Sequence, residues 1–316
     1  MSSNGQPPSA APEQSSPKDR MTDASADSRA RKRAKPEKHQ GFVGELVEIV
    51  KTVVYALLIA LVLRVILFQP YTIPSASDEP NLYRGDYIIV TKWSYGWSKN
   101  SMPFSPPLFS GRIFFSPPKR GDIIVFKLPS SGHVDFIKRL VGLPGDRIQV
   151  KAGQLIINDK PVQEKFLGPG QGNLPGGWQK VNLYQETNPE GRSYKIQKSP
   201  GFESAGDTGV YVVPQHCYFM MGDNRDNSLD SRFDPGLAPD DPKLGGCGWN
   251  SGLDEKVGDQ AGVGFVPEQN LVGRAGIILL SWNTGVDDEH PGGASIFKPW
   301  TWFTEARPSR FFKILH

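Results

Sequence analysis

Residues 135–146 read DFIKRLVGLPGD, a run of apolar and β-branched side chains that closes in a Pro-Gly turn. Such a run is typical of a β-strand followed by a turn. Alternate side chains of a strand share a face, so Lys138 is expected beside Phe136 and Leu140. That neighbourhood is unusual for a lysine, because burial disfavours its charged form. Taken alone, a lysine in a strand is more often a solvated surface charge.

Short runs of the same kind lie on both sides of this segment. Each is rich in valine, isoleucine or aromatic residues and is bounded by Gly, Pro, Asn or Asp, which is the pattern of strands separated by turns. Glycine and proline, at 34 and 28 of 316 residues, argue against a bundle of long helices. We therefore predict a mainly β fold. The other predicted strands are residues 87–90, 121–128, 147–159, 209–213, 217–223 and 272–282.

One segment does not fit this pattern. Residues 52–68 read TVVYALLIALVLRVILF and contain a single charge, Arg64. As a helix this run would span about 25 Å, near the lower limit for crossing a bilayer. Arg64 lies near one end, where its stem can reach the interface. We predict a single membrane anchor helix over residues 41–69, with a buried core helix as the alternative.

Residues 1–40 are dominated by Ser, Pro, Ala and charged side chains. They cannot bury enough apolar surface to offset the entropy lost on ordering, so we predict a disordered tail. Six basic residues against one acid at 29–38 place this tail in the cytoplasm and residues 70–316 outside. The net charge of only +3 and the adjacent membrane span argue against a nucleic-acid partner.

Two stretches interrupt the predicted strands. Residues 168–177, GPGQGNLPGG, are expected to form a flexible loop, and residues 234–264, rich in glycine and acids, an irregular surface insertion. These acids lack the spacing of a calcium loop, and the chain has no HExxH or CxxC pattern, so neither a metal nor a cofactor is predicted. Cys217 and Cys247 allow at most one disulfide, and the sequence leaves open whether they pair.

Three polar segments carry the candidate chemistry. They are IPSASDEPNL at 73–82, directly after the anchor, DFIKRLVGLPGD at 135–146, and MMGDNRDNSLDSR at 220–232. Each alone is better read as an ordinary turn, strand or polar loop. Together with a single N-terminal anchor they resemble bacterial type I signal peptidase (leader peptidase), a protease of the serine–lysine class. The resemblance covers about residues 50–148 and 208–283.

The resemblance implies that Ser77 is the nucleophile and that Lys138 is its general base. A serine hydroxyl is a poor nucleophile until a base takes its proton, and a lysine can be that base only when neutral, a state that burial favours. Ser75 would supply its hydroxyl to an oxyanion hole beside the main-chain N–H of Ser77. Among the supporting residues, Ser228 would hydrogen-bond Lys138 and orient it. Asp230 and Arg232 would brace the site, with Arg139 as a candidate addition. Gly222 would let the backbone turn.

The implied fold is an antiparallel β-sheet ectodomain over residues 70–316, with a less typical β subdomain at about 147–216, on the periplasmic side of the bacterial inner membrane. Its implied substrate is the signal peptide of an exported preprotein, cut after small residues and bound as an added β-strand. Membrane lipid and the secretion translocon are the other implied partners. The residues that match the family's substrate pocket are Tyr71, Ile73, Leu82, Phe136 and Ile137.

The sequence departs from the family pattern directly after the candidate nucleophile. The family usually has methionine there, then another residue, proline and threonine, whereas this chain has Asp78, Glu79, Pro80 and Asn81. Neighbouring side chains of an extended strand point to opposite faces, so Asp78 is expected to face away from Lys138. Two alternatives follow from the departure: a specialised maturation peptidase of the same class with few substrates, and a catalytically inactive relative that binds signal peptides.

The carboxy-terminal stretch, KPWTWFTEARPSRFFKILH at 298–316, combines aromatic with basic residues. This combination suits a bilayer interface. Packing of the terminal segment on its own domain is an equal alternative.

Overall fold

The structure is a computed structural model that describes residues 42–102, 105, 111–174, 177–200, 205–249, 261–284, 298 and 300–315. The predicted disordered tail, residues 1–40, lies outside the described residues, and so does the stretch 250–260 of the predicted insertion. The chain divides into two compact units, one that ends at Leu58 and one that begins at Ile59.

Helix α2 (Phe42–Ile66) lies within the predicted anchor at 41–69 but ends earlier than predicted, because Phe68 already belongs to strand β1 (Phe68–Thr72) and pairs with Thr91 of β2 (Asp86–Thr91). It begins well before the apolar run at 52–68, because residues that favour helices, such as Glu45 and Glu48, precede that run. Its segment Gly44–Arg64 is long and apolar enough to cross a membrane, with a mean hydropathy of 2.4, and none of it is buried against the described chain. This finding is consistent with the predicted anchor and gives no support to the alternative of a buried core helix.

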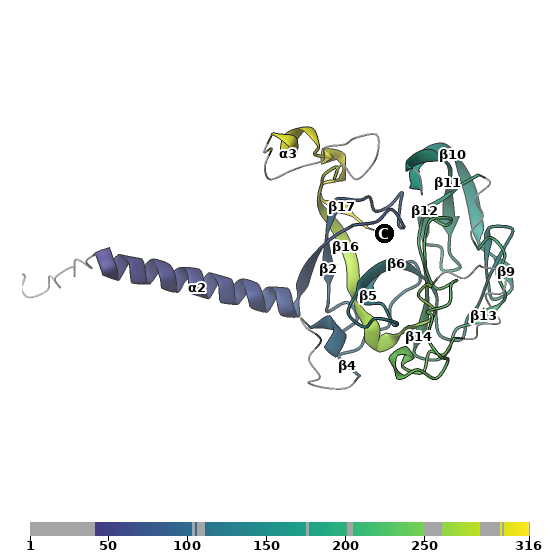
Figure 1. Cartoon of the computed structure of the whole chain (residues 1–316), viewed down its shortest axis with the longest axis horizontal. Helices are drawn as coiled ribbons and strands as arrows, with labels where there is room; N and C mark the ends of the chain where they lie inside the picture. Colours follow the sequence, from purple (N-terminus) through teal and green to yellow (C-terminus); the bar gives the residue numbers. More distant parts are fainter. Residues whose placement is uncertain are drawn as a thin grey trace, which may run out of the picture. The chain divides into compact units, whose positions relative to one another are not determined.

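The chain beyond this helix is mainly antiparallel β-structure, as predicted. The largest sheet has the strand order β1-β2-β16-β5-β6-β14-β15, with β17 paired to β16 (Figure 1). Strand β16 comes from late in the sequence yet pairs with both β2 and β5. The main sheet therefore joins segments from the beginning and the end of the domain. The bounds are β1 Phe68–Thr72, β2 Asp86–Thr91, β5 Ile123–Lys127, β6 Asp135–Gly142, β14 Cys217–Met221, β15 Val266–Pro267, β16 Leu271–Ser281 and β17 Lys313–Ile314.

Strand β6, which carries the candidate general base, lies between β5 and β14. Lys138 is paired with Ile124 of β5, and Arg139 is paired with Met221 of β14. Both side chains are buried, and so is Leu140. Because its strand is interior to the sheet, Lys138 belongs to the core and is not a solvated surface charge.

Three smaller sheets and a few short helices complete the described chain. The three-stranded sheet has the order β10-β11-β12, the four-stranded sheet has the order β13-β7-β8-β9, and β3 pairs with β4. Their bounds are β3 Trp97–Ser98, β4 Arg112–Ile113, β7 Arg147–Lys151, β8 Gln154–Ile157, β9 Lys160–Pro161, β10 Gln163–Leu174, β11 Gly177–Thr187, β12 Ser193–Lys198 and β13 Tyr211–Val212. The short helices are η2 Lys99–Ser101, η3 Pro242–Leu244, η5 Glu268–Asn270, α3 Thr301–Thr304 and η6 Pro308–Arg310.

The prediction of a flexible loop at 168–177 is wrong for most of its length. Strand β10 continues to Leu174 and pairs with β11 throughout this stretch. Its glycines provide room for neighbouring side chains: a Cβ on Gly170 would lie 2.9 Å from the Leu183 side chain, and one on Gly172 would lie 2.5 Å from the Gln197 amide. Close packing explains Gly170 and Gly172, whereas Gly168 has a φ of +128° beside a register shift of the strand.

The predicted surface insertion at 234–264 is tied into the core at residues that the structure describes. Trp249 is buried and packs against the rings of Tyr211 and Phe265, each with centroids 5.3 Å apart. Cys217 and Cys247 form a disulfide, which settles the question that the sequence left open. The bond joins the insertion to the first residue of β14, the strand that leads into the third polar segment.

The carboxy-terminal segment packs on its own domain. Leu315 is buried, β17 pairs with β16, and Arg310 donates from Nε to Asp86 Oδ1. Several aromatic side chains of the same segment nevertheless stay exposed, Phe303 most of all at 87%. The two sequence-based interpretations are thus compatible, because different residues of the segment meet the domain and the solvent.

Candidate active site

Ser77 lies in a tight turn between β1 and β2. Within the turn, the main-chain N–H of Leu82 donates to the carbonyl of Asp78 at 2.9 Å. Asn224, from the third polar segment, holds the turn from outside: its main-chain N–H donates to the carbonyl of Ser77, and its side-chain amide donates to the carbonyl of Ala76, both at 3.1 Å. The serine is therefore fixed by backbone contacts although it belongs to no strand or helix.

Lys138 points from β6 directly at this serine. Its Nζ is 2.6 Å from Ser77 Oγ and also donates to the carbonyl of Ile137 at 2.9 Å. The lysine side chain is only 4% exposed, and its amine lies 5.7 Å from the centre of the Phe136 ring. The fold thus brings together a hydroxyl and an amine from residues 61 positions apart.

Ser75 lies on the open side of the same turn. Its Oγ is 3.2 Å from Ser77 Oγ, and the pair is exposed. A hydroxyl at this distance can donate a hydrogen bond to an atom that reacts with Ser77. The position suits the oxyanion-hole role that the sequence suggested for Ser75.

Ser228 lies next to the turn, but its contacts differ from the expected ones. Among the described residues its buried Oγ has no hydrogen-bond partner, so the predicted hydrogen bond to Lys138 is not formed. Its hydroxyl lies over Gly222, where a Cβ would come within 2.3 Å of Ser228 Oγ and 2.4 Å of the carbonyl oxygen of Ser77. Gly222 is thus required for close approach between the third segment and the nucleophile turn.

Asp230 and Arg232 form the expected brace. The Arg232 guanidinium donates from Nε and Nη2 to the two carboxylate oxygens of Asp230, both at 2.9 Å, and Asp230 Oδ2 also accepts from the main-chain N–H of Gly222 at 3.0 Å. Burial alone would raise the pKa of Asp230, but the charge of Arg232 and these hydrogen bonds lower it overall. The brace therefore holds the glycine backbone in place.

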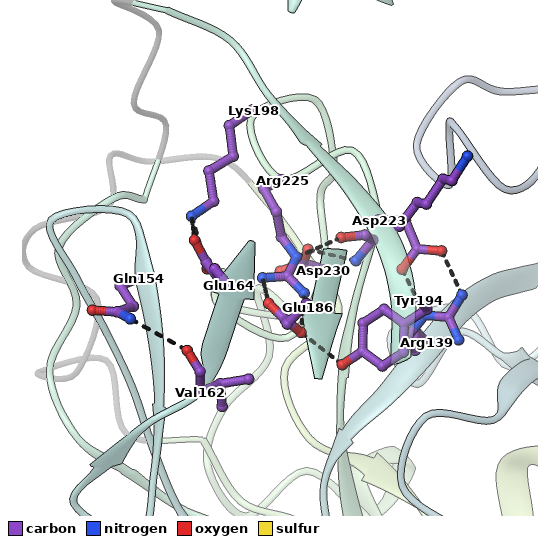
Figure 2. Close-up of polar contacts among 12 residues, drawn as sticks. Arg139, Gln154, Val162, Glu164, Glu186, Tyr194, Lys198, Asp223, Arg225 and Asp230 are labelled. Atoms are coloured by element: carbon purple, nitrogen blue, oxygen red, sulfur yellow. Dashed lines mark hydrogen bonds and ion pairs between the residues drawn. The ribbon is translucent and has the colours of Figure 1, made fainter. Parts of the chain in front are cut away.

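Arg139, the candidate addition to the brace, is paired with Asp223. It donates from Nε and Nη2 to the carboxylate of Asp223, at 2.7 and 2.8 Å, and not to Asp230 (Figure 2). Its guanidinium also stacks 4.0 Å from the centre of the Tyr194 ring, whose hydroxyl donates to Glu186. The residue next to Lys138 is thus locked to both the third polar segment and β12.

Asp223 and Asn81 are site residues that sequence reasoning did not find. The side-chain amide of Asn81 donates to Asp223 Oδ2 at 2.7 Å and to the carbonyl of Lys195 at 2.6 Å. Asp223 therefore connects the nucleophile turn with Arg139 on β6. The signals in the sequence were the polar run GDNRDN, which holds Asp223, and the segment IPSASDEPNL, which holds Asn81, but neither residue could be assigned a partner.

Asp78 does not face away from Lys138, so that prediction is wrong. Its side chain is 2% exposed, and Oδ2 lies 3.9 Å from Lys138 Nζ. The prediction assumed an extended strand, whereas Ser77 and Asp78 belong to a turn whose backbone folds back on itself. Burial, as the largest influence, raises the pKa of Asp78 to about 7. Its neighbour Glu79 points elsewhere and accepts from the main-chain N–H of Asn173 at 3.0 Å.

The five predicted pocket residues fall into two groups. Ile73 and Leu82 are buried, at 3% and 0% exposure, within the core cluster beneath the turn. The other three, Tyr71, Phe136 and Ile137, are half-buried at the edge of core clusters. Only these three have surface left with which to meet a bound peptide.

Comparison with known proteins shows which family the chain resembles. The family described as "Signal peptidase, peptidase S26" matches residues 46–282. Signal peptidase I of Rickettsia typhi is 36% identical over 273 residues, which is 83% of this chain and 91% of the relative. That of Rickettsia felis is 35% identical over 271 residues, which is 83% of this chain and 90% of the relative. A crystal structure of a signal peptidase I from Enterococcus faecalis aligns with 22% identity and a TM-score of 0.26, over 50% of this chain and 97% of that one.

The family match covers most of the chain, from within helix α2 to the end of β16. The relatives match over nearly their whole length at more than a third identity. On these two findings the chain belongs to the signal peptidase family of S26 peptidases.

Proposed function

We propose that this chain is a membrane-anchored endopeptidase that removes signal peptides from exported preproteins, with Ser77 as nucleophile and Lys138 as general base. The observation that carries the proposal is the 2.6 Å contact between the buried Lys138 Nζ and Ser77 Oγ in a partly buried site. Family membership supplies the class of substrate, and the contact supplies the pair of atoms that can carry out the chemistry.

The reaction begins when Ser77 Oγ attacks the scissile carbonyl carbon while the neutral amine of Lys138 takes the hydroxyl proton. The oxyanion that forms is stabilised by the Ser75 hydroxyl and the main-chain N–H of Ser77. As the peptide C–N bond breaks, the Lys138 ammonium returns the proton to the leaving amine. Water then attacks the ester carbonyl while Lys138 takes a proton from it. As the bond to Ser77 Oγ breaks, Lys138 returns this proton to the serine oxygen, and the carboxylic acid product leaves. Every proton is transferred between substrate, water and these two side chains.

The substrate binds as an extended peptide beside the turn. Strand β1 is at an edge of the main sheet and leads into the segment that carries Ser77, so a peptide can add to the sheet there through main-chain hydrogen bonds. The half-buried side chains of Tyr71, Phe136 and Ile137 then form the pocket walls. Bulky walls of this kind leave space for alanine-sized groups, which matches the small residues expected before the cleaved bond.

The exposed apolar helix supports the location of the enzyme. Helix α2 anchors the chain in the bacterial inner membrane, the basic tail stays in the cytoplasm, and residues 70–316 lie on the periplasmic side. Membrane lipid and the secretion translocon are then its natural partners, because preproteins emerge on that side.

The experiment is cleavage of a generic preprotein by the full chain in detergent. Ser77→Ala and Lys138→Ala should each abolish cleavage with the fold retained, and the double variant should be no worse than either single one, because residues that act as a unit are not additive. EDTA and phenanthroline should leave the rate unchanged. Wild-type rates for Lys138→Ala would refute the assignment. Cleavage of only a few preproteins would favour the specialised maturation peptidase.

A further inference from the structure

A carboxyl group lies beside the reacting pair and has no part in the mechanism above. The side chain of Asp78 is 2% exposed, and its Oδ2 is 3.9 Å from the amine that must take the proton of Ser77. Neither of its oxygens has a hydrogen bond of ordinary geometry among the described residues. A buried carboxyl without hydrogen bonds is costly, so its presence next to the general base calls for an explanation.

The charged groups around Asp78 come from two elements. Lys138 and Arg139 on β6 favour its ionised form, whereas Asp223, which follows β14, disfavours it by charge and lowers its pKa slightly through a main-chain N–H contact. Burial has the largest influence, and the pKa of Asp78 rises to about 7. Unlike an ordinary aspartate, Asp78 therefore changes its charge near neutral pH, while Arg139 and Asp223 are already neutralised by each other.

The separation of Asp78 and Lys138 decides how they can interact. At 3.9 Å between Oδ2 and Nζ, the two groups are too far apart for a direct hydrogen bond, so no proton passes between them in this arrangement. Both side chains are nearly buried, at 4% and 2% exposure, so the two groups are close enough for a strong charge interaction. An ionised Asp78 therefore stabilises the ammonium form of Lys138 and opposes the effect of burial.

We propose that Asp78 is a positioning residue that holds Lys138 in its ammonium form, so that cleavage is restrained near neutral pH and released only as the medium becomes alkaline. This inference rests on the proposed roles of Ser77 and Lys138. Two unit charges at this distance, with an effective dielectric constant of about 20, displace a pKa by about 3, which is an upper limit because the charges are partly screened.

The test is the pH profile of kcat/KM between pH 6 and 10 for the full chain in detergent on one signal-peptide substrate. Asp78→Asn keeps the shape and removes the charge, and Asp78→Met removes both charge and polarity. Each should lower the apparent pKa of the basic group by between about 1 and 3 and raise kcat/KM at pH 7 about tenfold or more, because activity below that pKa falls tenfold per pH unit. Glu79→Gln is the matched control: it neutralises the adjacent buried carboxyl, whose contact is with Asn173, and should leave the profile in place.

Two results would overturn the inference. One is an unchanged apparent pKa in whichever of the two Asp78 variants folds. The other is a loss of a hundredfold or more in kcat/KM at every pH, which would mean that the carboxyl assists the reaction. In either case the proposed function would still stand if Ser77→Ala and Lys138→Ala are inactive. If these two variants cleave the substrate, the proposed function itself is refuted.

Discussion

Ser228 Oγ lies directly over the Cα of Gly222, so close that a Cβ on the glycine would be 2.3 Å from it. On its other side the same Cβ would come within 2.4 Å of the main-chain oxygen of Ser77. The third polar segment and the nucleophile turn are thus in contact through a residue that has no side chain. The contact holds together two segments that are far apart in sequence and that carry the proposed site.

Gly222→Ala should destabilise the protein by about 3 kcal/mol and reduce kcat at least about a hundredfold, because the clash involves main chain as well as side chain. Gly276→Ala is the control, since its Cβ would meet only the Ile89 carbonyl at 4.0 Å. Thermal unfolding and cleavage rates of both variants check the prediction. Equal behaviour of the two variants would contradict it.

Ser228→Ala should separate stability from activity. The buried hydroxyl has no partner in the resting structure, so its removal should leave stability unchanged or raise it by about 1 kcal/mol. If the hydroxyl turns to Lys138 during the reaction, as the family resemblance implies, kcat should fall ten- to a hundredfold with KM unchanged. Denaturant unfolding and steady-state kinetics measure the two effects, and a full-rate variant would show that Ser228 does not orient the lysine.

The stability of the protein should depend on the charge of Asp78. Its folded-state pKa is about 7, above the ordinary value, so between about pH 4 and pH 7 the folded chain holds a proton that the unfolded chain has lost. The free energy of unfolding therefore falls as the pH rises through this window, by up to about 4 kcal/mol. Asp78→Asn should remove this part of the dependence of the unfolding free energy on pH. The variant should therefore be more stable than wild type at pH 8. If the curves of unfolding free energy against pH are parallel for wild type and Asp78→Asn, the stability does not depend on the charge of Asp78 and the prediction fails.

Loss of the disulfide should weaken the fold more than the chemistry. Cys217→Ser or Cys247→Ser releases the insertion from β14 and should cost about 2–4 kcal/mol, because the crosslink restricts the unfolded chain. Cleavage at low temperature should stay near the wild-type rate, since neither sulfur touches a proposed catalytic residue. Unfolding of wild type with and without reductant is the measurement, and a Tm that does not respond to reductant would refute the prediction.

The exposed aromatic residues of the terminal segment should bind lipid. Phe303→Ser and Trp300→Ser, at positions that are 87% and 62% exposed, should each weaken vesicle binding of residues 70–316 about tenfold without a change in Tm. Phe166→Ser, at a position that is 54% exposed on β10, is the control and should have no effect. Deletion of 305–316 should instead lower Tm, because it removes the buried Leu315. Unchanged vesicle binding of both point variants would favour a purely structural role for the segment.

Patterns along the chain were enough to predict the mainly β fold and the apolar helix. Strand alternation in DFIKRL correctly placed Lys138 beside Phe136, because a period of two is a property of the strand itself. Local composition was misleading where glycines serve packing: the run at 168–174 is a paired strand, since its glycines make room for Leu183 and Gln197. Nothing in the local sequence distinguishes a glycine needed for space from one needed for flexibility.

The contacts between distant segments were decided only by the tertiary structure. The pairing of Cys217 with Cys247, the pairing of Arg139 with Asp223 and the approach of Asp78 to Lys138 each depend on how separate segments pack. The predicted direction of Asp78 is wrong because the orientation of one side chain relative to the next depends on the backbone conformation, and residues 77–78 form a turn and not the extended strand that the prediction assumed. The sequence determined which chemical groups are available, whereas packing across the sheet determined which of them meet, because distances between remote residues are set by the whole fold.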